Sequence, residues 1–171
     1  MPPNNSIIRE GTTTKLSKHQ NSEATSTNTF IQSNHSPQDE QRLFRETFAI
    51  VQFVIYWFAG RKVDRHASSV DKKVRELTSE ILVKHDVYNA LCSNLGLTPE
   101  NLAANFRGVA ETIFEDGFVN WGRLIALLGF SVKVAEYFRL NFGNHDQIIV
   151  EMTTHFIVNK TGVWMESKQG W

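Results

Sequence analysis

The sequence lacks the features that usually mark an enzyme or a metalloprotein. Its 171 residues contain one cysteine, Cys92, so no internal disulfide can form. The six histidines include no His-x-x-x-His pair, and no Cys-x-x-Cys pair exists, so we expect no metal site. A glycine-rich phosphate loop is absent, and no base lies near Cys92 in sequence, which favours a packed thiol over a nucleophile. We therefore expect a protein that is not an enzyme and needs no cofactor.

Strong charge of one sign is absent too. The chain has 18 basic and 18 acidic residues, so no net charge steers it toward nucleic acid or an anionic membrane. The N-terminus has no apolar signal core. The most apolar run near it, residues 48–59, contains Gln52 and is too short to span a bilayer. With one unpaired cysteine, these observations predict a cytoplasmic protein.

Large apolar residues are scarce in residues 1–38, which are rich in Ser, Thr and Asn. Such a segment cannot bury enough apolar surface to offset the entropy lost on ordering. We therefore expect two parts, a disordered polar tail over residues 1–38 and a helical domain over residues 39–171. Ser36 and Pro37 mark the end of the tail.

The domain begins with a helix predicted to start at Pro37 and to stop at Gly60. A β-strand is the alternative for its Val, Ile and aromatic residues, but the length of the run favours a helix. A second, amphipathic helix carries apolar residues at spacings of four, three and four. These residues are Val70, Val74, Leu77 and Ile81.

The middle of the chain predicts two further helical regions. Residues 85–97 form short helical pieces with Val87, Tyr88, Leu91 and Leu95 on the inner side. A longer helix is expected to start at Thr98 as cap and Pro99 as its first residue. Its apolar stripe is Leu102, Phe106, Val109, Ala110, Ile113 and Phe114.

The central helix is expected to run from Asn120 to about Leu140. Asn is a favoured N-cap, and residues 124–130 are apolar on every side, so other helices must surround this one. Asp146 is the predicted cap of the next helix, residues 159–162 are expected to break it, and a last short helix carries Trp164. The domain is thus predicted to be all-α, a bundle of about seven or eight helices.

Arg123 lies in the first turn of the central helix, where a cation opposes the helix dipole. Two interpretations remain open from physics. The guanidinium pairs with a carboxylate of its own chain, or it receives one from a partner. Gly122 beside it has no side chain, so another backbone could approach.

Two motifs resemble those of the Bcl-2 apoptosis-regulator family. Residues 116–123, read Asp-Gly-Phe-Val-Asn-Trp-Gly-Arg, are similar to its first homology motif. Residues 164–171, read Trp-Met-Glu-Ser-Lys-Gln-Gly-Trp, resemble its second, at a similar spacing, and residues 50–55 weakly resemble its N-terminal motif. The resemblance covers roughly residues 41–171. Family members often carry a membrane anchor after the second motif, and the sequence given ends there.

The resemblance implies a globular bundle around the central helix, with a surface groove that binds the amphipathic death-motif helix of pro-apoptotic relatives. The partner's Asp would meet Arg123, and Asn120 would add a hydrogen bond beside Gly122. Association with the mitochondrial outer membrane or endoplasmic reticulum is also implied. The groove would be lined by Ile81, Val87, Tyr88, Leu91, Val109, Ile113, Ile125, Ala126 and Phe130.

The second helix resembles the family's third homology motif in its apolar spacing. However, Thr78 stands where Gly is usual, and Ser79 where Asp is usual. The segment is therefore expected to be a poor donor to another member's groove, and an anti-apoptotic regulator is the first hypothesis. The alternatives are a membrane-permeabilising effector using residues 124–130 and 148–157, and a helical scaffold with a closed groove.

Overall fold

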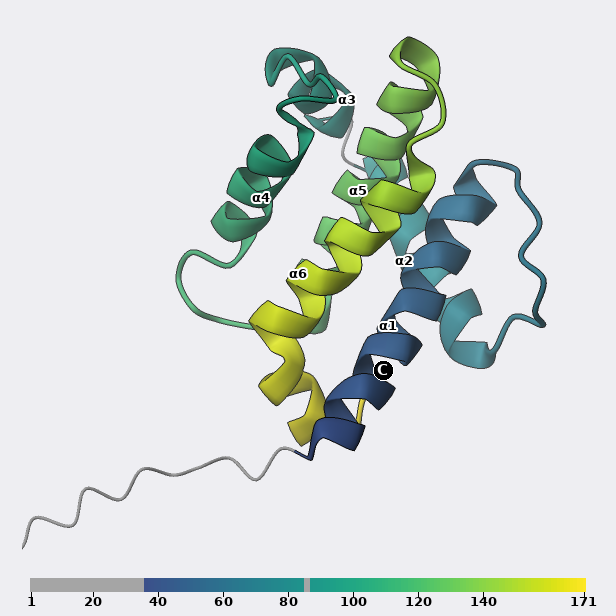
Figure 1. Ribbon diagram of the computed structural model, residues 1–171, viewed down its shortest axis with the longest axis vertical. Coiled ribbons are helices and arrows are strands. Elements are labelled where there is room, and N and C mark those ends of the chain that lie inside the picture. Colours follow the sequence, from purple (N-terminus) through teal and green to yellow (C-terminus); the bar gives the residue numbers. More distant parts are fainter. Residues whose placement is uncertain (1–35, 85–86) are drawn as a thin grey trace, which may run out of the picture. The chain divides into compact units, whose positions relative to one another are not determined.

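The computed structural model describes residues 36–84 and 87–171 (Figure 1). These residues form six α-helices and no strand, so the all-α prediction is confirmed, whereas the expected seven or eight helices exceed the number in the described part of the chain. The predicted tail lies almost wholly outside the described residues, and the domain boundary at 38/39 stays a prediction. The helices are α1 Pro37–Phe58, α2 Ser69–Lys84, α3 Val87–Asn94, α4 Leu102–Ile113, α5 Trp121–Asn141 and α6 Asp146–Ser167.

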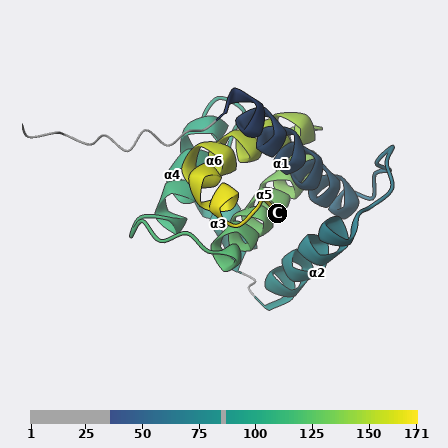
Figure 2. The ribbon, with the colours of Figure 1, turned by 90° about the horizontal axis from the view of Figure 1, so that it is seen from below.

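The apolar helix α5 lies at the centre, and Figure 2 shows the other helices grouped around it. It contacts all five of them. Leu124, Leu127, Leu128, Phe130 and Phe138 are completely buried. Each such side chain contributes about 1.5–3 kcal/mol when it leaves water, which explains why a helix without a polar face becomes the core.

The start of α1 agrees with the sequence prediction. Ser36 caps the helix by accepting a hydrogen bond from the Gln38 amide at 3.2 Å, and Pro37 occupies the first position. The run is helical throughout, so the strand alternative is wrong. The helix ends at Phe58, directly before Ala59 and Gly60, and Gly60 has a φ of +66° that favours glycine.

The predicted start of α4 is wrong. Thr98 and Pro99 lie in a turn before the helix, where the Thr98 amide donates to the Asn101 side chain at 2.8 Å. The helix begins at Leu102, after Asn101. The side chain of Asn101 also donates to the Gly96 carbonyl at 3.0 Å, so it stabilises this turn instead of capping the helix.

Asp146 does not cap α6, contrary to the prediction. The residue at the cap position is His145, and its side chain makes no capping bond. Asp146 is the first residue of the helix, buried, and it accepts from Arg61 at 3.1 Å and from Arg139 at 2.7 Å. Its carboxylate therefore ties the segment after α1 to both α5 and α6, because a buried charge needs partners.

The expected break at residues 159–162 is absent, because α6 continues to Ser167 and includes Trp164. A Cβ added at Gly162 would lie 3.6 Å from Leu43 of α1, so α6 packs closely on α1 here. Thr161 is buried and donates to the Ile157 carbonyl at 2.7 Å. Packing against α1 outweighs the cost of one helical glycine, and two predicted helices become one.

None of the helices over residues 36–84 and 87–171 has the length and apolarity that crossing a membrane requires.

Two of the helical glycines, Gly162 and Gly129, give a stability prediction. Gly162→Ala should raise the free energy of unfolding by about 0.5–1 kcal/mol, because the new methyl group makes an ordinary contact and helix entropy improves. Gly129→Ala is the control, since its Cβ would lie 3.3 Å from Ile81 and would force a shift. Urea unfolding measures both. Equal gains, or a loss at Gly162, would contradict this packing.

Candidate helix-binding groove

The start of α5 places Arg123 and its neighbours. The backbone at Asn120 is extended, and the Asn120 side-chain oxygen accepts from the Arg123 amide at 3.0 Å. The predicted N-cap is therefore confirmed. Because the amide oxygen of Asn120 is used in this cap, its NH2 group is the part that could donate to a partner.

Gly122 has a local role in this cap. A Cβ at Gly122 would lie 3.2 Å from the Asn120 side-chain oxygen, so a larger residue would crowd the capping bond. No other backbone approaches that position within the described part of the chain. The approach of another backbone at Gly122, considered from the sequence, stays a prediction.

The Arg123 guanidinium pairs with Asp116, seven residues earlier. The two terminal nitrogens of Arg123 each donate to a different carboxylate oxygen of Asp116. Nη1 donates to Oδ1, and Nη2 donates to Oδ2 at 2.5 Å. Nη1 also donates to the Phe118 carbonyl at 2.8 Å. Both side chains reach solvent, with 27% of Arg123 and 45% of Asp116 exposed. Of the two possibilities left open by the sequence, this structure contains the internal pair.

These contacts favour the ionised form of Asp116. Its hydrogen bond with Arg123, and then the Phe118 amide that donates to it at 3.0 Å, lower the pKa of Asp116 to about 2. The sequence analysis placed Asp116 in a motif but did not identify it as the partner of Arg123. The signal that could have identified it is its place in the same motif as Arg123, across the turn at Gly117.

The predicted lining residues surround α5 at different depths. Ile125 and Phe130 of α5 are buried. Val87, at the start of α3, is 62% exposed, so its predicted place on the inner side is wrong. The remaining predicted residues are half-buried, and they are Ile81, Tyr88, Leu91, Val109, Ile113 and Ala126.

α2 and the start of α3 pack closely on α5 at Gly129. A Cβ at Gly129 would lie 3.3 Å from Ile81, 3.7 Å from Leu82 and 3.7 Å from Tyr88. These side chains therefore rest directly on the α5 backbone, which accounts for the glycine there. A helix that entered at this end would have to move α2 or α3 outward.

The α2 stripe packs inward. Val74 is buried, and Val70, Leu77 and Ile81 pack against the core. Thr78 is buried, and its hydroxyl donates to the Val74 carbonyl at 2.8 Å. This supports the interpretation of α2 as a helix of the domain itself.

Three tryptophans join the two homology motifs. Trp121 contacts Trp164 with ring centres 4.9 Å apart and Trp171 at 5.7 Å. The indole of Trp171 donates to Thr47 of α1 at 2.9 Å. The sequence did not predict this cluster, which anchors the last residues beside the start of α5.

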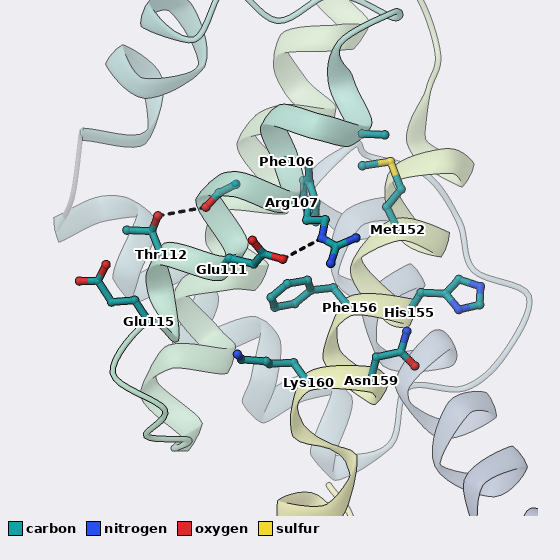
Figure 3. Close-up of a pocket in the computed structure, with 12 residues that line it drawn as sticks. Phe106, Arg107, Glu111, Thr112, Glu115, Met152, His155, Phe156, Asn159 and Lys160 are labelled. Atoms are coloured by element: carbon teal, nitrogen blue, oxygen red, sulfur yellow. Dashed lines mark hydrogen bonds and ion pairs between the residues drawn. The ribbon is translucent and has the colours of Figure 1, made fainter.

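A separate cavity of about 760 Å³ lies between α4 and α6 (Figure 3). Its floor contains Phe106 and Phe156, and its rim carries Arg107, which donates to Glu111 at 2.7 Å, and Lys160. None of the predicted groove residues lines it. It uses a different face of α4 from Val109 and Ile113.

Cys92 is buried, and burial raises the pKa of its thiol to about 11. The thiolate form is therefore scarce at neutral pH, as expected for a packed cysteine.

The described residues form a helical bundle, in which an enclosed apolar helix carries a cation at its solvent-facing start. The chain belongs to the Bcl-2 family of apoptosis regulator proteins, whose family model matches residues 74–171, more than half of the chain. Its members are non-enzymatic, in agreement with the sequence prediction.

Curated relatives agree with this membership. The chain is 28% identical to human Bcl-2 homologous antagonist/killer over 89 residues, 49% of this chain and 40% of the relative. It is 28% identical to cattle Bcl-2-related protein A1 over 61% of this chain and 57% of the relative. It is 27% identical to anti-apoptotic protein NR13 of Coturnix japonica, over 61% and 60%. The match thus spans 40% to 60% of these relatives.

Solved structures show the same fold. The complex of the zebrafish pro-survival protein NRZ with Bad BH3 has a TM-score of 0.72 and 17% identity, covering 78% of this chain and 93% of that one. Trichoplax adhaerens trBcl-2L2 bound to trBak BH3 has a TM-score of 0.68 and 22% identity, covering 75% and 93%.

The ion pair predicts a titration. In the Arg123→Ala variant the pKa of Asp116 should rise from about 2 toward its ordinary 3.8, with the Phe118 amide keeping it somewhat lower. Because the folded pKa is depressed, the pair's stabilisation is present above pH 3.8 and lost as the pH falls through about 2. Carboxyl-carbon NMR measures the titration. An unchanged Asp116 pKa in the variant would contradict the pair.

Proposed function

We propose that this protein is a pro-survival regulator that binds the amphipathic death-motif helix of pro-apoptotic relatives. The binding site is the groove between the end of α2, α3, α4 and α5. The observation that carries the proposal is Arg123, a partly exposed guanidinium at the start of a buried helix, beside half-buried apolar side chains. Apolar anchors at helical spacing with one acid suit such a surface.

The relatives favour the pro-survival role. NR13 is named as anti-apoptotic and NRZ as pro-survival, and the NRZ and trBcl-2L2 structures are complexes with BH3 segments. The chain's own α2 has Ser79 where the death motif usually has Asp, and its apolar stripe is packed inward. This arrangement suits a receiver of such helices better than a donor.

The test is calorimetric binding of a death-motif peptide. Arg123→Ala should weaken binding about three- to tenfold, because the ligand Asp loses a charge-assisted partner at a partly exposed site. Arg107→Ala is the matched control, since Arg107 lies on the other face of α4 in a pair with Glu111. Its affinity should stay within about twofold. Equal losses in both variants, or none in Arg123→Ala, would contradict the assigned contact.

A membrane-permeabilising effector is the second candidate, favoured by the similarity to human Bcl-2 homologous antagonist/killer. Helices α5 and α6 of this chain carry the apolar residues that an inserting hairpin would need. Dye release from liposomes after addition of the peptide would favour this role. Tight peptide binding without release is the result expected of a pro-survival regulator.

The closed-groove scaffold makes a different prediction. The observation that favours this alternative is the close packing of Ile81 and Tyr88 on Gly129. A protein of this kind would bind no death-motif peptide at all. Measurable binding at micromolar peptide would exclude it.

A further inference from the structure

We propose that Asp71 is a positioning residue of the proposed groove. Together with Arg65 and Ser68 it fixes the start of α2 on α1, so a helix that enters the groove displaces only the other end of α2, residues 79–83. This inference rests on the proposed function, since the displacement follows from the entry of a partner helix.

The start of α2 is tied by a buried carboxylate. The Asp71 side chain is completely buried, and it accepts from the two terminal nitrogens of Arg65 at 2.5 Å and 2.7 Å. It also accepts from the amide of Ser68 at 2.7 Å and from the Ser68 hydroxyl at 2.8 Å. A buried charge that loses its partners is strongly destabilised, so this carboxylate keeps all of these groups together.

Arg65 extends the tie to α1. Its Nη2 donates to the Ala49 carbonyl at 2.8 Å, and its guanidinium lies 5.7 Å from the centre of the Phe53 ring. Both residues belong to α1. The start of α2 therefore cannot leave α1 unless these contacts and the buried pair break.

At the other end of α2 the contacts are of a different kind. Ile81 and Leu82 are half-buried and pack on the α5 backbone at Gly129, and Val83 is 84% exposed. Contacts between apolar atoms are individually weak. These contacts therefore part more readily than the buried ion pair at the start of the helix.

Two hollows give this end of α2 room to move. One, of about 390 Å³, is lined by α2 and by Trp57 of α1, and the other, of about 270 Å³, is lined by α2, Phe58 of α1 and α5. Ser79 and Val83 line both, and none of the predicted groove residues lines either. The end of α2 can therefore move away from the groove into space that already exists.

The helix can bend between its two ends at Thr78. The Thr78 hydroxyl is buried and donates to the Val74 carbonyl, four residues earlier, at 2.8 Å. A hydroxyl that bonds such a carbonyl slightly destabilises a helix and often bends it. Residues 79–83 can therefore swing while residues 69–77 stay on α1.

The experiment measures distances between pairs of spin labels on the full chain, with and without a death-motif peptide. Labels on exposed Val163 of α6 and Leu140 of α5 are two references, each paired with a label at Lys72 or at Val83. The native thiol of Cys92 is buried, so it does not compete for the label.

Peptide binding to the wild-type sequence should change the Val83 distances by about 2 Å or more and leave the Lys72 distances within about 1 Å. Lys72 reports on the start of α2 and Val83 on its end. Equal changes at both positions would mean that α2 moves as one body. That result, or no change at either position with peptide bound, would overturn the proposal.

Two variants test the role of Asp71 itself. Asp71→Asn removes the charge that ties Arg65 to α2, at nearly the same size, so peptide binding should now change the Lys72 distances by about 2 Å or more too. Arg65→Gln should have the same effect, and it decides the matter if circular dichroism shows that Asp71→Asn does not fold. Glu76→Gln is the matched control, because it breaks only the exposed pair with Lys73 on the same helix.

Lys72 should stay in place in Glu76→Gln. If it also stays in place in Asp71→Asn and Arg65→Gln, or moves in all three variants, Asp71 is not what fixes the start of α2 and the proposal is overturned. Calorimetry on the same samples separates this result from a failure of the proposed function. Binding with the wrong distances overturns the positioning role alone, whereas absence of binding by the wild-type protein overturns both.

Discussion

The constraint on which this structure depends is the burial of α5. Residues 124–130 offer water no polar face, so the helix is stable only when the other helices enclose it. Ser131, the first hydroxyl after this run, is buried too and is satisfied by the Leu127 carbonyl at 2.8 Å and by Thr153 at 2.9 Å. The arrangement of α1, α2, α3, α4 and α6 follows from covering this one element.

The burial of α5 also bears on where its two arginines lie. The buried first part of α5 meets solvent at its start, whereas Lys133 and Glu136 lie further along the helix and pair with each other on its partly exposed side. Arg123 lies at the beginning and reaches outward to Asp116. Arg139 lies near the other end and pairs with buried Asp146. The first pair is partly exposed, whereas the carboxylate of the second is enclosed and serves the fold.

Sequence patterns predicted what local chemistry determines. The Asn120 cap, the Ser36–Pro37 start and the inward stripe of α2 depend on a few neighbouring residues, and each appears in the structure. The errors arose where distant contacts decide. Gly162 looked like a helix break because the packing of α6 on Leu43 cannot be read from the sequence, and Asp146 looked like a cap because its partners Arg61 and Arg139 are distant in sequence.

The candidate site shows the same division. Arg123 is recognisable from the sequence as the cation in the first turn of α5. The apolar run that follows it predicts the burial of Ile125 and Phe130. The partner of Arg123 depends on a turn whose geometry is set by Gly117, and the tightness at Gly129 depends on side chains from α2 and α3. Neither feature is visible without the packed fold.

The central claim is that a partner helix lies along α5 and not in the cavity between α4 and α6. Backbone amide NMR during titration with a death-motif peptide tests it most directly. The largest shift changes are expected at Val109, Arg123 and Ala126, with His155 and Asn159 nearly unchanged. Changes concentrated at His155 and Asn159, which line the other cavity, would contradict it.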